Sequence, residues 1–186
     1  ADVMVLFGSG GHSSEMMMLI QNANLSKRMD LKEINRLICV VSEDDKLIGE
    51  KMKHEFRELR SNNKLETVAL RRGRKVGQSY LTSIWTTIVS IIHSINLILT
   101  YKPKLCLTNG PAVGVTMAVA IRCLQLATCC LGYSCQILYI ESFCRTKTLS
   151  LSGKLIYHLR LADQFYVQWP ELSARYGRAR YEGILV

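Results

Sequence analysis

The residues with the clearest chemical potential lie in a glycine-rich segment near the start of the chain. Five apolar residues precede this segment, as in a buried strand of a parallel sheet, and Ser13 or Ser14 can cap a following helix. A strand, a glycine turn and a helix N-terminus together present backbone N–H groups and a positive dipole end to an anion, usually phosphate. We therefore predict a phosphate site formed by Gly8, Ser9, Gly10 and Gly11.

His12 follows the glycines directly and would place an imidazole at the edge of this site. Histidine is the most frequent general acid or base in enzymes, so His12 is a candidate catalytic residue. Two simpler interpretations stay open at this point. The turn could connect a strand and a helix without binding a ligand, and a single histidine is more often structural than catalytic.

A second loop of small residues supports the same site. Asn109 and Gly110 follow a predicted strand over residues 104–108 and precede an apolar helix over residues 115–131. Ligands of open parallel sheets bind outside the carboxyl ends of the strands, near the point where the strand order reverses. We therefore expect both loops to face one crevice and to hold a ligand the size of a diphosphate.

Glu141 is a second candidate for acid–base chemistry. It follows a predicted strand over residues 135–140, so its carboxylate would lie at the same edge of the sheet. There it could act as a general base or bind a hydroxyl group, and Arg145 could contribute to the diphosphate site. A helix cap, or an ion pair with Arg145, is the structural alternative for Glu141.

The elements that must position these residues alternate between strand and helix. Apolar runs predict strands over residues 3–7, 36–42, 104–108, 135–140 and 164–168, and a weak alternation predicts another over residues 65–70. Helices are expected over residues 14–24, 47–59, 81–99 and 115–131, with short helices after residues 149–154 and from residue 169. This rhythm predicts one α/β domain over residues 1–186 with a Rossmann-like, doubly wound parallel sheet.

The acidic turn over residues 43–45 suggests a rival function, because dinucleotide-binding folds place an acidic residue after the second strand to hold ribose. Their fingerprint requires a third glycine where this chain has Ser13. A nucleotide-dependent oxidoreductase therefore stays an alternative, which a titration with NAD or FAD would test.

The segment over residues 78–101 contains no charged residue, and its apolar residues recur at helical spacing. Many hydroxyl and amide groups on the opposite face favour an amphipathic helix over a spanning one. That helix could pack on the sheet or lie in a membrane interface next to a basic loop. The residues that would approach the membrane are Arg71, Arg72, Arg74, Lys75 and Trp85.

Composition narrows the choice of partners. A net charge of +9 over 186 residues favours anionic ligands or acidic lipid headgroups. No aromatic and basic platform for nucleic acid is recognisable. The seven cysteines include no CxxC pair, and most of them lie in apolar runs. We expect reduced cysteines in the core, without disulfides or a metal site.

Six motifs in order along the chain carry a resemblance that covers nearly its whole length. They are Gly8–His12, Asn109–Pro111, Glu141–Arg145, Ser150–Lys154, Val167–Trp169 and Gly183–Val186. The chain resembles the membrane-anchoring subunits of the eukaryotic UDP-N-acetylglucosamine (UDP-GlcNAc) transferase of asparagine-linked glycosylation. It departs from that family at Ala112 and Val113, where glycine and threonine are usual. The family also carries a membrane helix ahead of the first strand, which the given chain lacks.

The resemblance implies the N-terminal, acceptor-side half of a split B-type glycosyltransferase. A separate cytosolic subunit would bind UDP-GlcNAc, the donor substrate, and no further cofactor is expected. Together the two would add the second GlcNAc to GlcNAc-diphosphodolichol on the cytosolic face of the endoplasmic reticulum. His12 or Glu141 would serve as the base, and we favour Glu141 at this point because His12 could instead be needed beside the phosphate. A scaffold that only recruits the donor-binding subunit is the alternative.

The chain ends on three aliphatic residues, Ile184, Leu185 and Val186. Such residues at a free end would normally fray into water, and burying each one stabilises a structure by about 1.5–3 kcal/mol. We predict that they dock in a groove of the donor-binding subunit. Folding back onto the domain's own sheet is the alternative.

Overall fold

Strands and helices alternate along the chain in the computed structural model, which describes residues 1–8, 10–25, 34–42, 46–57, 61–62, 64–70, 80–110, 112–128 and 132–186. The strands are β1 (Asp2–Leu6), β2 (Arg36–Ser42), β3 (Leu65–Leu70), β4 (Leu105–Thr108), β5 (Gln136–Ile140), β6 (Gln164–Val167) and β7 (Arg180–Tyr181). The helices are α1 (Gly11–Leu25), α2 (Lys46–Glu55), α4 (Tyr80–Tyr101), α5 (Ala112–Ala127), α6 (Leu151–His158) and α7 (Pro170–Arg175).

All strands run parallel in one sheet of order β3-β2-β1-β4-β5-β6-β7. The order reverses at β1, whose Val5 pairs with Cys39 of β2 on one side and with Leu107 of β4 on the other. The loops after β1 and β4 therefore leave the sheet side by side, which is where this class of fold forms its ligand crevice. The predicted Rossmann-like fold is confirmed.

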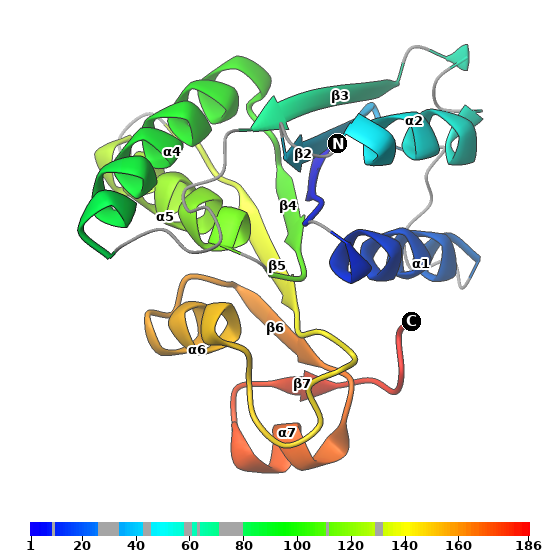
Figure 1. Ribbon diagram of the computed structural model, residues 1–186, viewed down its shortest axis with the longest axis vertical. Coiled ribbons are helices and arrows are strands. Elements are labelled where there is room, and N and C mark those ends of the chain that lie inside the picture. The colour runs from blue at the N-terminus through cyan, green and yellow to red at the C-terminus, as the bar shows by residue number, and fades with distance from the viewer. Residues whose placement is uncertain are drawn as a thin grey trace.

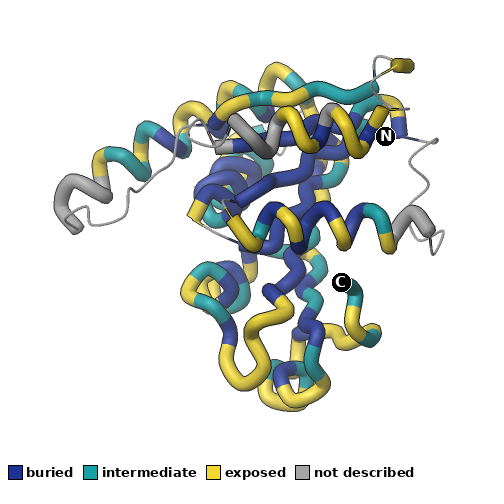
Figure 2. Tube along the Cα trace, turned by 45° about the vertical axis from the view of Figure 1, so that its right-hand side comes forward, coloured by how far each residue is buried: buried dark blue, intermediate teal, exposed yellow. Residues whose placement is uncertain are grey.

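Helices cover both faces of the sheet, with α1 and α2 on one side and α4, α5 and α6 on the other (Figure 1). Alternate residues of β1 enter the two cores, because side chains of a strand point to opposite faces. Val3 and Val5 pack with α1 and α2, whereas Met4 and Leu6 pack with the opposite layer. The central strands β1 and β4 are largely buried between these layers, whereas β3 at one edge is partly exposed and β7 at the other edge is exposed (Figure 2).

The first helix corrects one prediction. It begins at Gly11, three residues before the predicted start, so Ser13 and Ser14 lie inside the first turn and neither is the cap. Ser13 is buried, and its hydroxyl donates to the carbonyl of Gly8. The two-residue strand β7 was also not predicted, because it has no apolar run to indicate it.

Helix α4 turns part of its polar face inward. Ser90 and Ser94 are buried, and the Ser90 hydroxyl lies 3.4 Å from the hydroxyl of Thr116 in α5. Ile98 joins the core, but the side chains of Trp85 (69% exposed) and Ile92 (51%) face outward. The predicted polar and apolar faces are therefore only partly correct, because small hydroxyl side chains allow α4 and α5 to approach closely. Among the described residues, no helix combines the length and the apolar character needed to cross a membrane.

The cysteines in the described part of the chain are all free thiols. Cys39, Cys106 and Cys135 are buried as expected, and burial raises the pKa of the Cys39 thiol to about 12. Cys123 and Cys144 are exposed instead.

Candidate active site

The loop between β1 and α1 makes the predicted tight turn at the reversal point of the sheet. Gly8 is buried, and Gly10 has a φ of +63°, a left-handed conformation that favours glycine. Gly11 then opens the fifteen-residue helix α1, whose first N–H groups have no partner within the helix. Ser9 lies outside the described residues. The turn therefore offers backbone donors at the positive end of a helix dipole.

The loop after β4 is joined to this turn through Asn109. Its side chain is buried, and its Nδ2 donates to the backbone carbonyl of His12 at 2.8 Å. Gly110 follows with a φ of +84°. The structure thus brings together the two loops predicted to form one site, but the Asn109 amide donor is used to hold the first loop.

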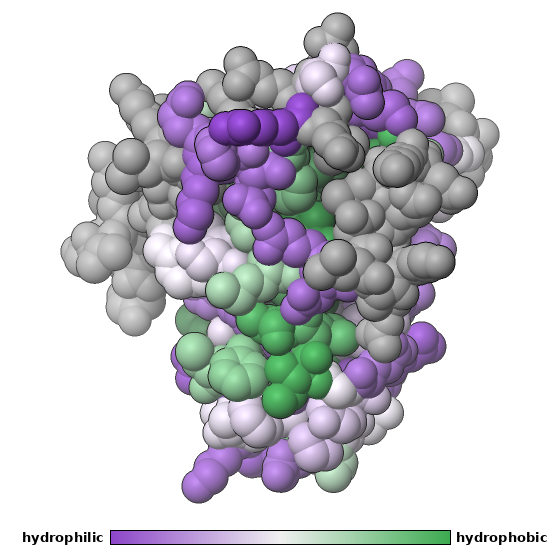
Figure 3. Space-filling model, turned by 90° about the vertical axis from the view of Figure 1, so that its right-hand side faces the viewer, coloured by the Kyte–Doolittle hydropathy of each residue, from purple (hydrophilic) through white to green (hydrophobic). Residues whose placement is uncertain are grey.

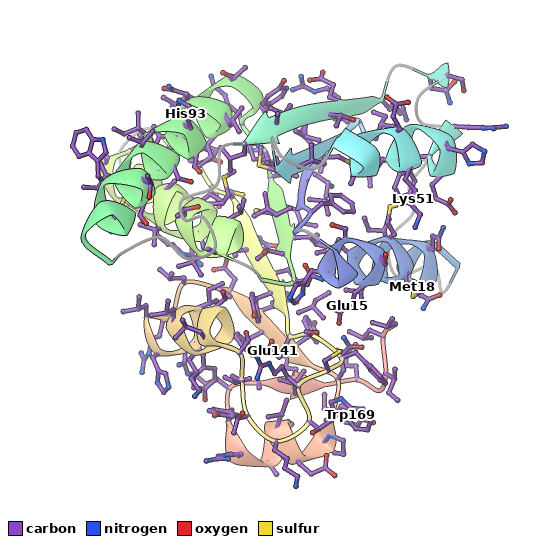
Figure 4. The ribbon with its side chains drawn as sticks, in the orientation of Figure 1. Glu15, Met18, Lys51, His93, Glu141 and Trp169 are labelled. Atoms are coloured by element: carbon purple, nitrogen blue, oxygen red, sulfur yellow. The ribbon has the colours of Figure 1, made fainter. Side chains whose placement is uncertain are left out.

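Glu15 is the residue that sequence reasoning missed. It lies on α1 (Figure 4) and is only 9% exposed, and its carboxylate contacts the loops after β4, β5 and β6. Oε1 accepts from the Phe143 N–H at 2.5 Å and from Gln168 Nε2 at 3.1 Å, and Oε2 lies 3.5 Å from Asn109 Nδ2. Burial alone would raise the pKa of Glu15, but His12 and the Phe143 N–H outweigh it and lower that pKa. Glu15 is therefore held as a carboxylate.

His12 lies beside Glu15 on the first turn of α1. The spacing of three residues places both side chains on one face of the helix, and Nδ1 of His12 is 3.7 Å from Oε2 of Glu15. The His12 side chain is 40% exposed. The imidazole is thus partly accessible from solvent and lies next to a fixed negative charge. The spacing from His12 was the one signal in the sequence that could have indicated Glu15.

Glu141 follows β5 as predicted, but it is fully buried, with an exposed fraction of 0%. Its Oε1 accepts from the Ser142 N–H at 3.0 Å, and its Oε2 accepts from the N–H of Ser150 at 3.0 Å and from its hydroxyl at 3.2 Å. Ser150 in turn caps α6. Burial raises the pKa of Glu141, although these hydrogen bonds act against it. The carboxylate therefore binds the start of α6 from within the domain.

The segment after Glu141 forms the outer edge of the site. Arg145 is exposed there, in a turn closed by a hydrogen bond from its N–H to the Ser142 carbonyl. The rings of Phe143 and Trp169 lie 5.2 Å apart, and the Trp169 indole N–H donates to the Phe143 carbonyl at 2.7 Å. An accessible cation and an aromatic pair thus adjoin the buried carboxylates.

The C-terminal tail lies against the same side of the molecule as α1 (Figure 1). Leu185 donates its N–H to Gln168 Oε1 at 3.3 Å and accepts from Asn22 Nδ2 at 3.1 Å. Leu185 and Val186 are partly buried against the core next to α1, whereas Ile184 is 54% exposed. Apolar surface gathers on the face that carries this tail (Figure 3).

The membrane-proximal prediction is only partly covered by the structure. Trp85 is exposed on α4, together with Ile88, Ile92 and Leu99. The basic loop, with Arg71, Arg72, Arg74 and Lys75, lies outside the described residues, as does the acidic turn over residues 43–45.

The family described as "Oligosaccharide biosynthesis protein Alg14 like" matches residues 3–185 of the chain. The chain belongs to the Alg14 family. Its relatives include the UDP-N-acetylglucosamine transferase subunit ALG14 of Debaryomyces hansenii, 38% identical over 100% of this chain and 77% of the relative. The proteins of the same name from Mus musculus and Homo sapiens are 36% and 33% identical, and each match covers 99% of this chain and 82% of the relative. The predicted family is confirmed.

Solved structures support the fold of this Alg14-family chain. Acinetobacter baumannii MurG matches it with a TM-score of 0.56 at 16% identity, over 91% of the chain and 42% of MurG. The UDP-GlcNAc 2-epimerase of Methanocaldococcus jannaschii matches with a TM-score of 0.55 at 12% identity, over 97% of the chain and 45% of that protein. At this identity the likeness shows the fold alone.

Proposed function

We propose that this chain is the acceptor-side subunit of a UDP-GlcNAc transferase. It would add the second GlcNAc to GlcNAc-diphosphodolichol at the cytosolic face of the endoplasmic reticulum membrane, together with a subunit that binds UDP-GlcNAc. The observation that carries this proposal is the pairing of a glycine turn with an accessible His12 at the reversal point of the sheet. Names of relatives in the Alg14 family supply the reaction class.

The geometry suggests how the two substrates would meet. The turn of Gly8, Gly10 and Gly11, with the exposed Arg145, would hold the acceptor's diphosphate through backbone donors and charge. His12 would take the proton of the acceptor hydroxyl while that oxygen attacks the anomeric carbon of UDP-GlcNAc and UDP leaves. Of the two predicted bases we favour His12, because Glu141 has no exposed surface and accepts hydrogen bonds with both oxygens. Neither step uses a further cofactor.

The proposal is tested by transfer of GlcNAc to a short-chain GlcNAc-diphospholipid, using the chain assembled with its donor-binding subunit. Replacing His12 by Ala should lower kcat by about 10²–10⁴-fold, the usual contribution of a general base. Co-purification with the partner should not change. A loss below about tenfold in an intact complex would point to the scaffold function instead.

Two surfaces would connect the chain to its surroundings. We propose that Ile184, with Leu185 and Val186, docks in the donor-binding subunit, since Ile184 is an exposed aliphatic side chain beside the site. I184D should then weaken partner binding at least tenfold, while L159D, at a residue 60% exposed on the opposite layer, should not. Equal affinities for the two variants would exclude this contact.

The exposed row of Trp85, Ile88 and Ile92 on α4 would lie in the membrane interface, with the basic loop beside it. Neutralising Arg71, Arg72, Arg74 and Lys75 should weaken flotation with anionic vesicles, because each such residue contributes about 1 kcal/mol near acidic lipid. Added salt should have the same effect. Flotation that does not respond to salt would contradict the contact.

A further inference from the structure

Glu15 has a contact set that the proposed chemistry does not yet use. Its carboxylate joins the helix that carries His12 to the loops after β4, β5 and β6, through Asn109, Phe143 and Gln168. Such a carboxylate has little freedom to rotate, because Oε1 is held by two donors from different segments. Oε2 is left facing the imidazole of His12.

Nδ1 of His12 is the complementary feature. Within the described part of the chain, this nitrogen has no hydrogen-bond partner although it is shielded from solvent. Its 3.7 Å distance from Glu15 Oε2 is longer than a hydrogen bond. Hydrogen bonds of catalytic groups are often long in the free enzyme and shorten when substrate binds. Oε2 of Glu15 is therefore placed to accept a hydrogen bond from Nδ1 once this distance shortens.

A carboxylate opposite Nδ1 decides which tautomer a neutral imidazole adopts. The hydrogen bond made by one ring nitrogen decides which nitrogen carries the proton. Glu15, as an anion, can only accept, so it favours the proton on Nδ1 and leaves the lone pair on Nε2. The other polar side chains that contact Glu15 are those of Asn109, Ser142 and Gln168, and all three are neutral donors. Two further titratable groups come from the neighbouring part of the sheet: Tyr139 lies on β5, and Glu141 directly follows β5.

We infer that Glu15 is a positioning residue for His12, which fixes the imidazole in the tautomer that presents Nε2 to the acceptor hydroxyl. This inference rests on the proposed transferase function. When His12 takes the proton at Nε2, Glu15 stabilises the imidazolium that forms, and Glu15 itself stays ionised. A second-layer carboxylate of this kind acts through orientation and charge.

A double-mutant cycle in the intact two-subunit complex tests this role. E15Q should lower kcat about 10–100-fold, the effect usual for a residue that orients another, with little change in the KM for the acceptor. In an H12A background, E15Q should lower kcat less than about twofold, because the imidazole that Glu15 positions is already absent. Q168M is the matched control, since it removes a neighbour of Glu15 but leaves the His12 contact. Q168M should lower kcat less than E15Q does, and by the same factor with and without His12.

Equal losses from E15Q in both backgrounds would overturn the inference and leave Glu15 a structural link between loops. A failure of the transferase proposal is seen separately, as a loss below tenfold for H12A alone. Nitrogen NMR of the histidines gives a readout that needs no activity. His12 is one of four, its signals assigned by their absence in H12Q, and should show a proton on Nδ1. E15Q should move that proton toward Nε2. An unchanged tautomer would also overturn the inference, and E15D serves where E15Q does not fold.

Discussion

Glu15 and Glu141 are both carboxylates buried at the carboxyl edge of one sheet, yet they differ in how far along the chain their hydrogen-bond partners lie. The partners of Glu141 are near in sequence, since Ser142 is one residue away and Ser150 nine. Glu15 instead binds groups 128 and 153 residues further along the chain. The pKa of Glu141 is raised and that of Glu15 is lowered. Glu141 thus binds backbone groups at the start of one helix, whereas Glu15 connects several distant loops next to His12.

Among the changes that distinguish Glu141 from Glu15, we expect Glu141→Ala to have the largest effect on stability. It leaves the N–H groups of Ser142 and Ser150 without their buried acceptor, and each unsatisfied group costs about 1–3 kcal/mol. We expect the free energy of unfolding to fall by about 3 kcal/mol or more, measured by urea denaturation. L151A, at an exposed position of the same helix start, is the control. A loss below about 1 kcal/mol would mean that Glu141 is not a structural cap.

A smaller effect is expected from Gly153→Ala, which disturbs Glu141 without removing it. A Cβ at this position would overlap Oε2 of Glu141. Overpacking of this kind usually costs about 1–3 kcal/mol, and thermal unfolding should report it. Gly177→Ala is the matched control, because a Cβ there has no atom within 4 Å. If both variants unfold at the same temperature, the Glu141 carboxylate can move aside to accommodate the added methyl group.

The smallest effect is a difference in pH dependence. Because the pKa of Glu15 is lowered in the folded state, its stabilisation is present above its ordinary value of 4.5 and is lost as pH falls through the folded pKa. The raised pKa of Glu141 has the opposite sign, so its contribution is present below 4.5 and is lost as pH rises through the folded pKa. E15Q should flatten the acidic side of a plot of unfolding free energy against pH, and E141Q the side above 4.5. Identical changes in slope would contradict the assigned directions.

The same contrast explains what the sequence could predict. Apolar runs indicated β1, β2, β4, β5 and β6, since buried parallel strands have near-continuous apolar residues, and a weak alternation indicated β3. The glycine turn, His12 and Glu141 are likewise local patterns, and the structure places them at one edge of the sheet. For Glu15 the only local signal was its spacing from His12, because its partners Phe143 and Gln168 come next to it only through the strand order. The start of α1 was missed because Gly11, a poor helix former, opens the helix.

Gln168 has a consequence for how assembly and chemistry are linked. Its Nε2 donates to Glu15, and its Oε1 accepts from the backbone of Leu185 in the tail. One fully buried amide therefore faces both the group beside the base and the segment proposed to meet the partner. If partner docking draws the Leu185 N–H away, the hydrogen bond to Glu15 is free to strengthen. If that change alters the affinity for a ligand, the ligand must alter the affinity for the partner by the same factor, because coupling between sites is reciprocal. One coupling free energy would then link substrate binding to subunit association.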